Sequence, residues 1–151
     1  MTSVKALFES PTILHRRWGI AWLGVAIALA LHVTDEALTG FLPLYDSIVL
    51  ELRESYAFVP LPAFTFSGWL SGLIVAVLIL LLLSPLVFAG RKPLRYLSYV
   101  LSVIMILNGL GHIGASLYWG ILAPGVISSP ILLAAAVALL VTTIDARAQA
   151  D

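Results

Sequence analysis

The chain has 151 residues, of which 61% are hydrophobic and only 11% are charged, and its formal net charge is zero. A soluble domain carries roughly 25% charged residues, so this composition excludes an ordinary soluble globule and is typical of a multi-pass membrane protein. The neutral charge gives no reason to expect a nucleic-acid partner. The lack of cysteine excludes disulfides, thiolate metal ligands and cysteine nucleophiles. Because the apolar runs are long and continuous, they favour transmembrane helices over a transmembrane β-barrel.

Four runs of the sequence are long and apolar enough to cross a bilayer, which takes about 20 residues per helix. Turn residues separate the last three runs: Gly90 and Pro93 lie in one polar turn, and Pro124 and Gly125 break the next. We therefore predict an all-α membrane protein, a four-transmembrane-helix bundle that forms a single domain over residues 1–151. The predicted spans cover residues 18–41, 64–88, 94–119 and 126–144.

The basic residues lie almost entirely on one side of the predicted spans. Lys and Arg concentrate in cytoplasmic segments of membrane proteins, so this bias predicts that both termini are cytoplasmic. Only Arg53 falls on the other side. The first span, with its basic flank and the small residues Ala28 and Ala30, also resembles a signal peptide, but we favour a retained span. The seven basic residues on the cytoplasmic side are Lys5, Arg16, Arg17, Arg91, Lys92, Arg95 and Arg147.

The longest predicted connection, residues 42–63, joins the first and second spans. Five of its apolar or aromatic residues recur at helical spacing on one face, and its acidic residues lie on other faces. This pattern predicts a short amphipathic helix on the outer membrane surface and not a solvated loop. The residues of the apolar face are Tyr45, Ile48, Val49, Leu52 and Tyr56.

The first span contains a stripe of ionisable residues in an otherwise apolar segment. If this span ended at Leu31 it would be too short to cross the bilayer, so its helix must continue and carry these residues into the outer third of the membrane. Positions i, i+3, i+4 and i+7 share one helix face. A carboxylate at membrane depth costs at least about 2–3 kcal/mol, so we expect this face to turn into the bundle. The stripe consists of His32, Asp35, Glu36 and Thr39.

Polar residues of the other spans fall at the same depth. Asn108 and His112 are four residues apart in the outer part of the third span, and so lie on one helix face. The second span begins with serines and glycines over residues 67–72, where Gly68 and Gly72 would permit close helix approach. The fourth span opens with the polar segment 124–130. We therefore predict one polar layer across all four helices.

The chemistry of this layer suits a metal ion. Imidazole and carboxylate ligands from His32, Asp35, Glu36 and His112 match zinc, non-haem iron or manganese. Asn108 could orient a ligand or the substrate. A metal-activated water could then attack an ester or amide bond of a lipid-like substrate. The leading interpretation is a membrane enzyme, dependent on a metal or on acid/base chemistry, that acts on a lipid or other apolar molecule from the outer leaflet.

Three other interpretations stay open. His32 and Glu36 could act as an acid/base pair without a metal, in an isomerase or a proton relay. The chain could instead be a non-catalytic accessory subunit of a larger membrane complex, in which a histidine binds haem or another tetrapyrrole, or in which the bundle binds a pigment, a quinone or a lipid. Finally, the polar side chains could satisfy one another and fix the register of the helices.

These residues resemble the signature of the HXXEE-domain membrane proteins. The stretch His32-Val33-Thr34-Asp35-Glu36 corresponds to His-x-x-Glu-Glu, with Asp35 in place of the first Glu. The family also has an Asn and a His in a later helix, followed by a Pro-Gly step, which here look like Asn108, His112 and Pro124-Gly125. The resemblance runs from the first span into the fourth. It implies a multi-pass membrane protein with a site at these residues, and it supplies no substrate.

Overall fold

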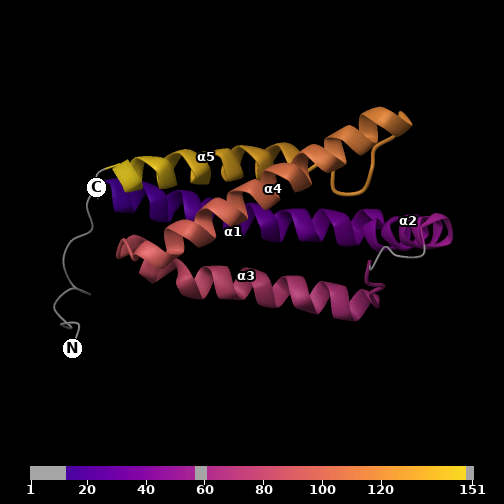
Figure 1. Ribbon diagram of the computed structural model, residues 1–151, viewed down its shortest axis with the longest axis horizontal. Coiled ribbons are helices and arrows are strands. Elements are labelled where there is room, and N and C mark those ends of the chain that lie inside the picture. The colour runs from indigo at the N-terminus through magenta and orange to yellow at the C-terminus, as the bar shows by residue number, and fades with distance from the viewer. Residues whose placement is uncertain (1–12, 57–60, 149–151) are drawn as a thin grey trace.

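The computed structural model describes residues 13–56 and 61–148, which form five α-helices and no strand (Figure 1). Four of these helices, all except α2, are long and apolar enough to cross a membrane. The predicted all-α architecture with four spans and one additional short helix is therefore confirmed. The helices are α1 (Ile13–Thr39), α2 (Phe41–Ser55), α3 (Phe66–Phe88), α4 (Lys92–Trp119) and α5 (Ser129–Ala148).

The helix boundaries differ from the predicted spans mainly in α1 and α5. Helix α1 begins at Ile13 and not at residue 18, because its basic first turns continue the helix beyond the apolar segment. Helix α5 begins at Ser129, three residues later than predicted, and continues to Ala148. The delay arises because Gly125 adopts a left-handed conformation, with φ of 81°, and the chain turns there before the helix starts.

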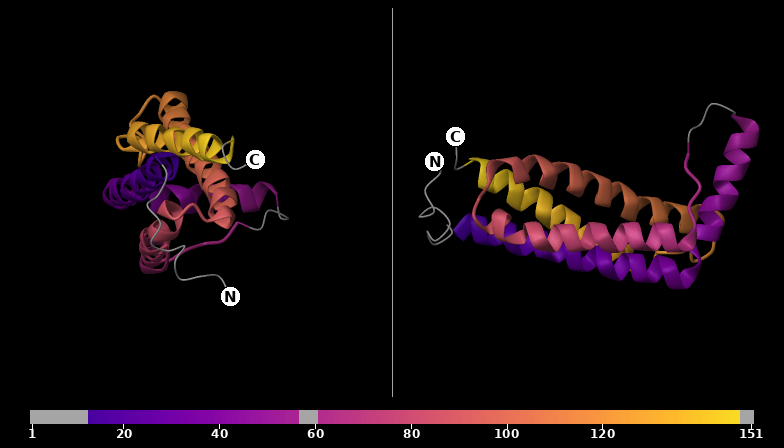
Figure 2. Two further views of the ribbon diagram at one scale, coloured as in Figure 1. Left: turned by 90° about the vertical axis from the view of Figure 1, so that its left-hand side faces the viewer. Right: turned by 90° about the horizontal axis from the view of Figure 1, so that it is seen from below.

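Helix α1 is the central element of the bundle. It packs between α3 and α5, and α4 packs along α5 while crossing over α1 (Figure 1; Figure 2, left). Two fully buried tryptophans on α1 connect it to its neighbours. Trp18 Nε1 donates to Ser98 Oγ of α4 at 3.0 Å, and Trp22 Nε1 donates to the Leu80 carbonyl of α3 at 2.8 Å. The half of the bundle where α1 begins is therefore held by specific hydrogen bonds between helices as well as by apolar packing.

Helix α2 lies across one end of the bundle (Figure 2, right). The turn from α1 into α2 takes a single residue, Gly40, whose φ of 83° suits glycine best. The predicted amphipathic helix within residues 42–63 is confirmed, and it starts at Phe41. Val49 of its apolar face is buried and the other helical members of that face are half-buried, whereas Tyr56 lies beyond the helix end and is exposed.

Helix α3 is the most exposed span. It buries only Leu80, Ser84 and Val87, and large side chains such as Leu82, 76% exposed, face outward as a lipid-facing helix requires. The close helix approach that Gly68 and Gly72 would permit is not used within the described residues. Both glycines are exposed, and a Cβ added at either would touch nothing outside α3 and its N-cap, because α3 contacts α1 through a different face.

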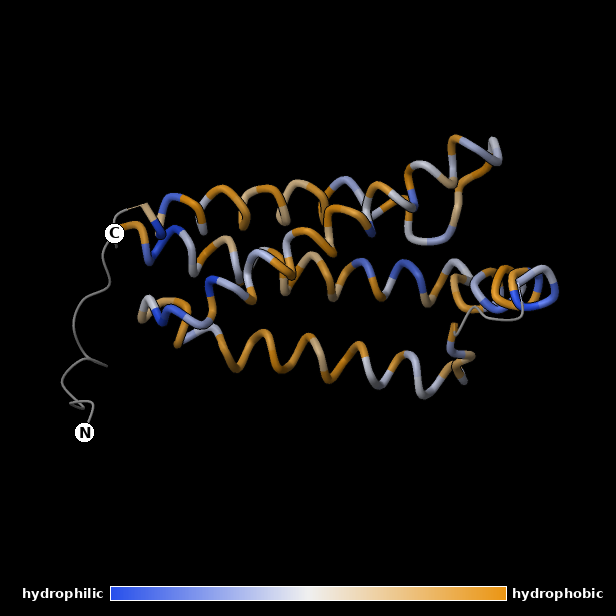
Figure 3. Tube along the Cα trace, viewed as in Figure 1, coloured by the Kyte–Doolittle hydropathy of each residue, from blue (hydrophilic) through white to orange (hydrophobic). Residues whose placement is uncertain are grey.

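Hydrophilic residues gather in three places along the bundle (Figure 3). One group lies at the end where α1 begins and α5 ends, a second lies on α2, and a third interrupts the apolar sequence of α1 in its second half (Figure 3). The third group is the predicted polar stripe. His32 and Glu36 are buried, whereas Asp35 is half-buried and Thr39 is exposed, so only part of the stripe faces the interior of the bundle.

Candidate metal centre

Two histidines and one glutamate meet inside the bundle near its α2 end. His32 and Glu36 come from α1, and His112 comes from α4. Glu36 Oε1 lies 3.0 Å from His112 Nε2 and 3.5 Å from His32 Nε2. One ligand atom from each residue can be chosen so that all three lie within 4.8 Å of one another. The side chains are only 1%, 5% and 10% exposed for His32, Glu36 and His112.

The positions of these three residues follow from helix geometry. His32 and Glu36 are one turn apart on α1, so their side chains point the same way. His112 reaches the same place because α4 lies close to α5 about one helical turn before His112, at Gly109. Gly109 is buried there, and a Cβ at this position would lie 3.3 Å from the Ser129 carbonyl oxygen. A glycine at residue 109 therefore lets α4 approach closely beside the cluster.

Ser128 connects the cluster to Asp35. Its hydroxyl oxygen lies 2.8 Å from Asp35 Oδ2 and 2.8 Å from His32 Nδ1, and its backbone N–H also donates to Asp35 Oδ2 at 2.9 Å. A carboxylate only accepts hydrogen bonds, so the serine hydroxyl donates to Asp35 and accepts from His32 Nδ1–H. This chain of hydrogen bonds fixes the tautomer and the orientation of the His32 ring.

The other nitrogen of His32 faces the cluster. Nε2 is buried, and it has no hydrogen-bond partner among the described residues, although Glu36 Oε1 lies 3.5 Å away. With the proton of a neutral ring on Nδ1, Nε2 presents a lone pair toward a carboxylate oxygen. Two electron-rich atoms face each other favourably only with a positive charge between them. A metal-bound histidine has this arrangement, with its second nitrogen hydrogen-bonded to an orienting group.

The turn between α4 and α5 covers the Glu36–His112 pair. Gly125 lies so close that an added Cβ would be 3.0 Å from both Glu36 Cγ and the His112 ring. The Gly125 backbone N–H donates to Thr39 Oγ1 at 3.2 Å, which joins the turn to the C-terminal end of α1. Position 125 therefore needs glycine for its left-handed φ and also for the space beside the cluster.

Carboxylates outnumber lysines and arginines in the layer around the cluster. Asp35 and Glu36 contribute two carboxylates, and the single basic residue at this end of the described structure is Arg53. The guanidinium of Arg53 donates to the Leu61 carbonyl outside the bundle. Buried carboxylates require a compensating charge or protonation. One divalent cation would balance both carboxylates.

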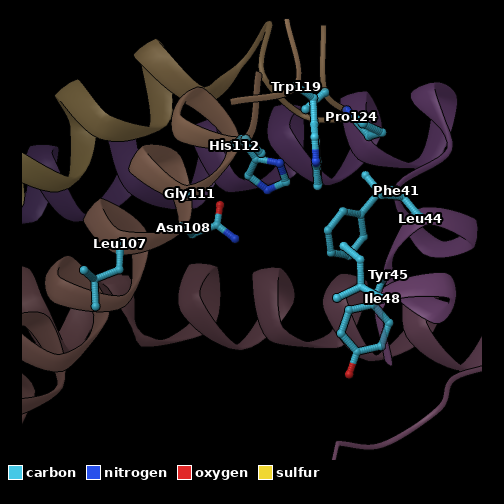
Figure 4. Close-up of a pocket in the computed structure, with 12 residues that line it drawn as sticks. Phe41, Leu44, Tyr45, Ile48, Leu107, Asn108, Gly111, His112, Trp119 and Pro124 are labelled. Atoms are coloured by element: carbon cyan, nitrogen blue, oxygen red, sulfur yellow. The ribbon is translucent and has the colours of Figure 1, made fainter. Parts of the chain in front are cut away.

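A pocket of about 280 Å³ opens beside the cluster, between α2 and α4 (Figure 4). His112 belongs to the cluster and also lines this pocket, facing the Phe41 ring at a centroid distance of 5.6 Å. Asn108 lines the same wall one helical turn away. Its Oδ1 is buried and accepts no hydrogen bond from the described part of the chain. The rest of the lining is mainly apolar and aromatic, including Tyr45 and Trp119.

The structure brings together three of the five predicted site residues. His32, Glu36 and His112 form the cluster, Asp35 orients His32 through Ser128, and Asn108 lines the adjoining pocket. Sequence reasoning did not single out Ser128. The only signal for it is a polar pair, Ser128-Ser129, where an apolar span was expected to begin.

The cluster has the ligand composition His₂Glu, which is common to catalytic zinc sites, and a 2-His-1-carboxylate set also serves non-haem iron. No family model, no curated protein and no solved structure matches this chain.

Proposed function

We propose that this protein is a membrane-embedded metalloenzyme that binds one divalent ion through His32, Glu36 and His112 and acts on a lipid or other apolar molecule. The observation that carries the proposal is the convergence of the three ligand atoms within 4.8 Å. Ligands 2.0–2.2 Å from a metal are separated from one another by about 3.0–3.5 Å. The two separations to Glu36 Oε1, 3.0 and 3.5 Å, lie in this range.

Two further observations favour a metal over a metal-free acid/base pair. His32 Nε2 points toward Glu36 and makes no hydrogen bond within the described ranges, so this nitrogen is available to coordinate a cation. The two carboxylates of this layer, Asp35 and Glu36, match the charge of one divalent ion. A single extra proton on His32 or His112 would balance only one of them.

The pocket beside His112 supplies the site for the substrate. Its size, about 280 Å³, is close to the lower limit for small-molecule pockets, and its apolar lining suits part of an acyl chain. We propose that the side-chain amide of Asn108, which lines this pocket, forms a hydrogen bond with the substrate. The reaction class is hydrolysis of an ester or amide: water adds its oxygen to the carbonyl carbon, the bond to the leaving group breaks, and the alcohol or amine leaves with a proton. The metal would supply Lewis-acid activation of water.

We also propose an orientation and a family. The basic residues at the end where α1 begins and α5 ends favour a cytoplasmic location for both termini, which puts the cluster near the outer face. The gathering of His32, Glu36 and His112 beside Asn108 and Gly125 supports membership of the HXXEE-domain family. In this proposal Asp35 takes the place of the first glutamate and orients His32.

Metal analysis of the purified full chain in detergent tests the metal site. We expect close to one zinc, iron or manganese ion per chain, and loss of that ion in Glu36→Gln, which keeps the shape of the side chain and removes its charge. His15→Gln is the matched control, since His15 is the one histidine outside the cluster and lies near the other end of α1. Metal content that stays unchanged in Glu36→Gln would contradict the proposal.

The same sample distinguishes the alternatives. A visible absorption band that disappears in His112→Ala would identify a tetrapyrrole site and overturn the metalloenzyme. If the chain holds no metal and takes up none from added zinc, iron(II) or manganese, the cluster is an acid/base or structural element.

A chromogenic substrate series tests the pocket. p-Nitrophenyl esters of increasing acyl length should be hydrolysed faster as the chain fills the pocket, and chelation should stop the reaction. Asn108→Leu has nearly the same volume and no acceptor, so we expect it to bind metal normally and to hydrolyse the esters more slowly. A metal-loaded protein that leaves all these esters and the matching anilides intact would refute hydrolysis, but not the metal site.

A further inference from the structure

A second pocket lies at the opposite end of the molecule from the metal centre, with a volume of about 220 Å³. Four of its five lining residues belong to the first turns of α4 and are spaced i, i+3, i+4 and i+7, so they form one stripe on that helix. The end of α5 supplies the fifth. The lining residues are Lys92, Arg95, Tyr96, Tyr99 and Arg147.

The lining of this pocket is basic and phenolic. Its lining contains three cations and two phenols, and no carboxylate. The single described carboxylate at this end of the bundle is Asp145, which does not line the pocket. Arg95 Nε is buried, and within residues 13–56 and 61–148 it has no hydrogen-bond partner. A buried guanidinium N–H with no acceptor is costly, and the guanidinium of Arg95, which lines the pocket, has further N–H donors that suit the oxygens of an anion.

The surface next to this pocket identifies the kind of anion. The face of α4 that carries Lys92, Tyr96 and Tyr99 continues along the helix with Val103 and Leu107, which are 49% and 63% exposed. The stripe therefore changes from cationic to phenolic to apolar along one helix face. A phosphate headgroup in the pocket would have its acyl chain lying on the exposed apolar part. Free phosphate has no acyl chain, so it would make no contact with the exposed apolar part of this helix face.

We propose that this pocket binds the phosphate group of an anionic phospholipid. Basic pockets between transmembrane helices are suited to such headgroups, and tyrosines belong at the depth of the headgroup region. Lys92 and Arg95 would donate to the phosphate oxygens, with the phenols of Tyr96 and Tyr99 beside them. The site is about 30 Å from His112 along α4, at 1.5 Å per residue, so it does not depend on the metal centre.

Lipid titration of the detergent-purified full chain tests this proposal. We expect phosphatidylglycerol, but not phosphatidylcholine with the same acyl chains, to remain bound in native mass spectrometry and to raise the unfolding temperature. The double variant Lys92→Gln/Arg95→Gln should weaken binding of phosphatidylglycerol about thirtyfold, as two lost charge contacts imply. Arg16→Gln removes one charge at the same end of the bundle, outside the pocket, and should change the affinity by no more than about twofold.

Three results would overturn the lipid site. The first is equal retention of the two lipids, and the second is an equal loss of affinity in Arg16→Gln and in Arg95→Gln. The third is saturation of the thermal shift by inorganic phosphate alone, which would identify a soluble phosphate as the ligand.

If the double variant does not fold, Tyr99→Phe removes only one hydroxyl and should still weaken phosphatidylglycerol binding. If the two single variants, Tyr99→Phe and Arg95→Gln, both bind phosphatidylglycerol with unchanged affinity, the proposal is refuted.

Discussion

The hydroxyl of Ser128 holds the His32 ring in the orientation that a metal would need. It accepts from His32 Nδ1 and donates to Asp35, so Asp35 is connected to the cluster through this serine. Groups that orient a metal-bound histidine typically contribute 10–100-fold to metal affinity. Asp35 therefore contributes to the site although its carboxylate is not part of the His₂Glu cluster.

Ser128→Ala should lower metal affinity by roughly 10–100-fold, because the His32 ring loses its orienting partner while all three ligands stay in place. Competition with a chelator of known affinity measures the change. Ser67→Ala, an exposed serine on α3, is the control and should bind metal as the wild type does. Equal affinities in Ser128→Ala and the wild type would remove Ser128 and Asp35 from the site.

Gly125→Ala should both destabilise the protein and abolish metal binding. A left-handed conformation costs a residue with a Cβ about 1–2 kcal/mol, and here the new methyl group would also press on Glu36 and His112. Gly120→Ala separates the two effects, since Gly120 has φ of 67° but no atom within 4 Å of an added Cβ. We expect both variants to unfold at lower temperature and only Gly125→Ala to lose the metal. A full metal complement in Gly125→Ala would contradict the described packing.

The three residues of the cluster could be predicted from the sequence to lie together, whereas Ser128, which orients one of them, could not. His32, Glu36 and His112 were predictable because helical periodicity and membrane depth are both regular functions of residue number. Ser128 was not, because its position depends on a turn whose path is set by Gly125 and by hydrogen bonds to α1. A local pattern of sequence contains no information about contacts made across such a distance.

At the scale of the elements, α1 organises the bundle through its buried tryptophans. Trp22→Phe removes the hydrogen bond to the Leu80 carbonyl of α3, and should reduce the free energy of unfolding by about 1 kcal/mol, the size of typical hydrogen bonds between membrane helices. Unfolding in mixed detergent micelles measures the change. Trp119→Phe alters a tryptophan that is 41% exposed and should leave the stability nearly unchanged. An equal loss in the two variants would show that the interhelical bond contributes nothing.

The positions of the helices in the sequence were largely predictable, whereas the contacts between the helices were not. Hydropathy and turn residues located all four spans, and periodicity located α2, because each signal is local. The face of α3 that contacts α1 was not predicted, and the close approach that Gly68 and Gly72 would permit is not used within the described structure. Small residues permit close approach but do not require it, and here larger residues such as Leu73 and Val77 make the contact with α1.

For the whole molecule, the main prediction concerns orientation in the membrane. Ser47→Cys on α2 and Ala148→Cys at the end of α5 place single thiols at exposed positions near opposite ends of a chain that lacks cysteine. Neither change removes a basic residue, so the topology signal is preserved. We expect an impermeant thiol reagent to label Ser47→Cys from outside the cell and Ala148→Cys only after lysis. Labelling of both variants in intact cells would overturn the proposed orientation.

The chain order of the cluster has a consequence for biogenesis. Helix α1, which carries His32 and Glu36, leaves the ribosome before α4, which carries His112. Ser128 follows in the turn between α4 and α5. Helix α3 contributes no residue to the cluster. During synthesis, α1 through α3 can enter the bilayer while two carboxylates still lack their partners. Insertion of the last two helices is therefore the step that completes the site. In the proposed function, the ion would therefore bind only after α4 and α5 have been inserted, so that metal loading would report insertion of these two helices.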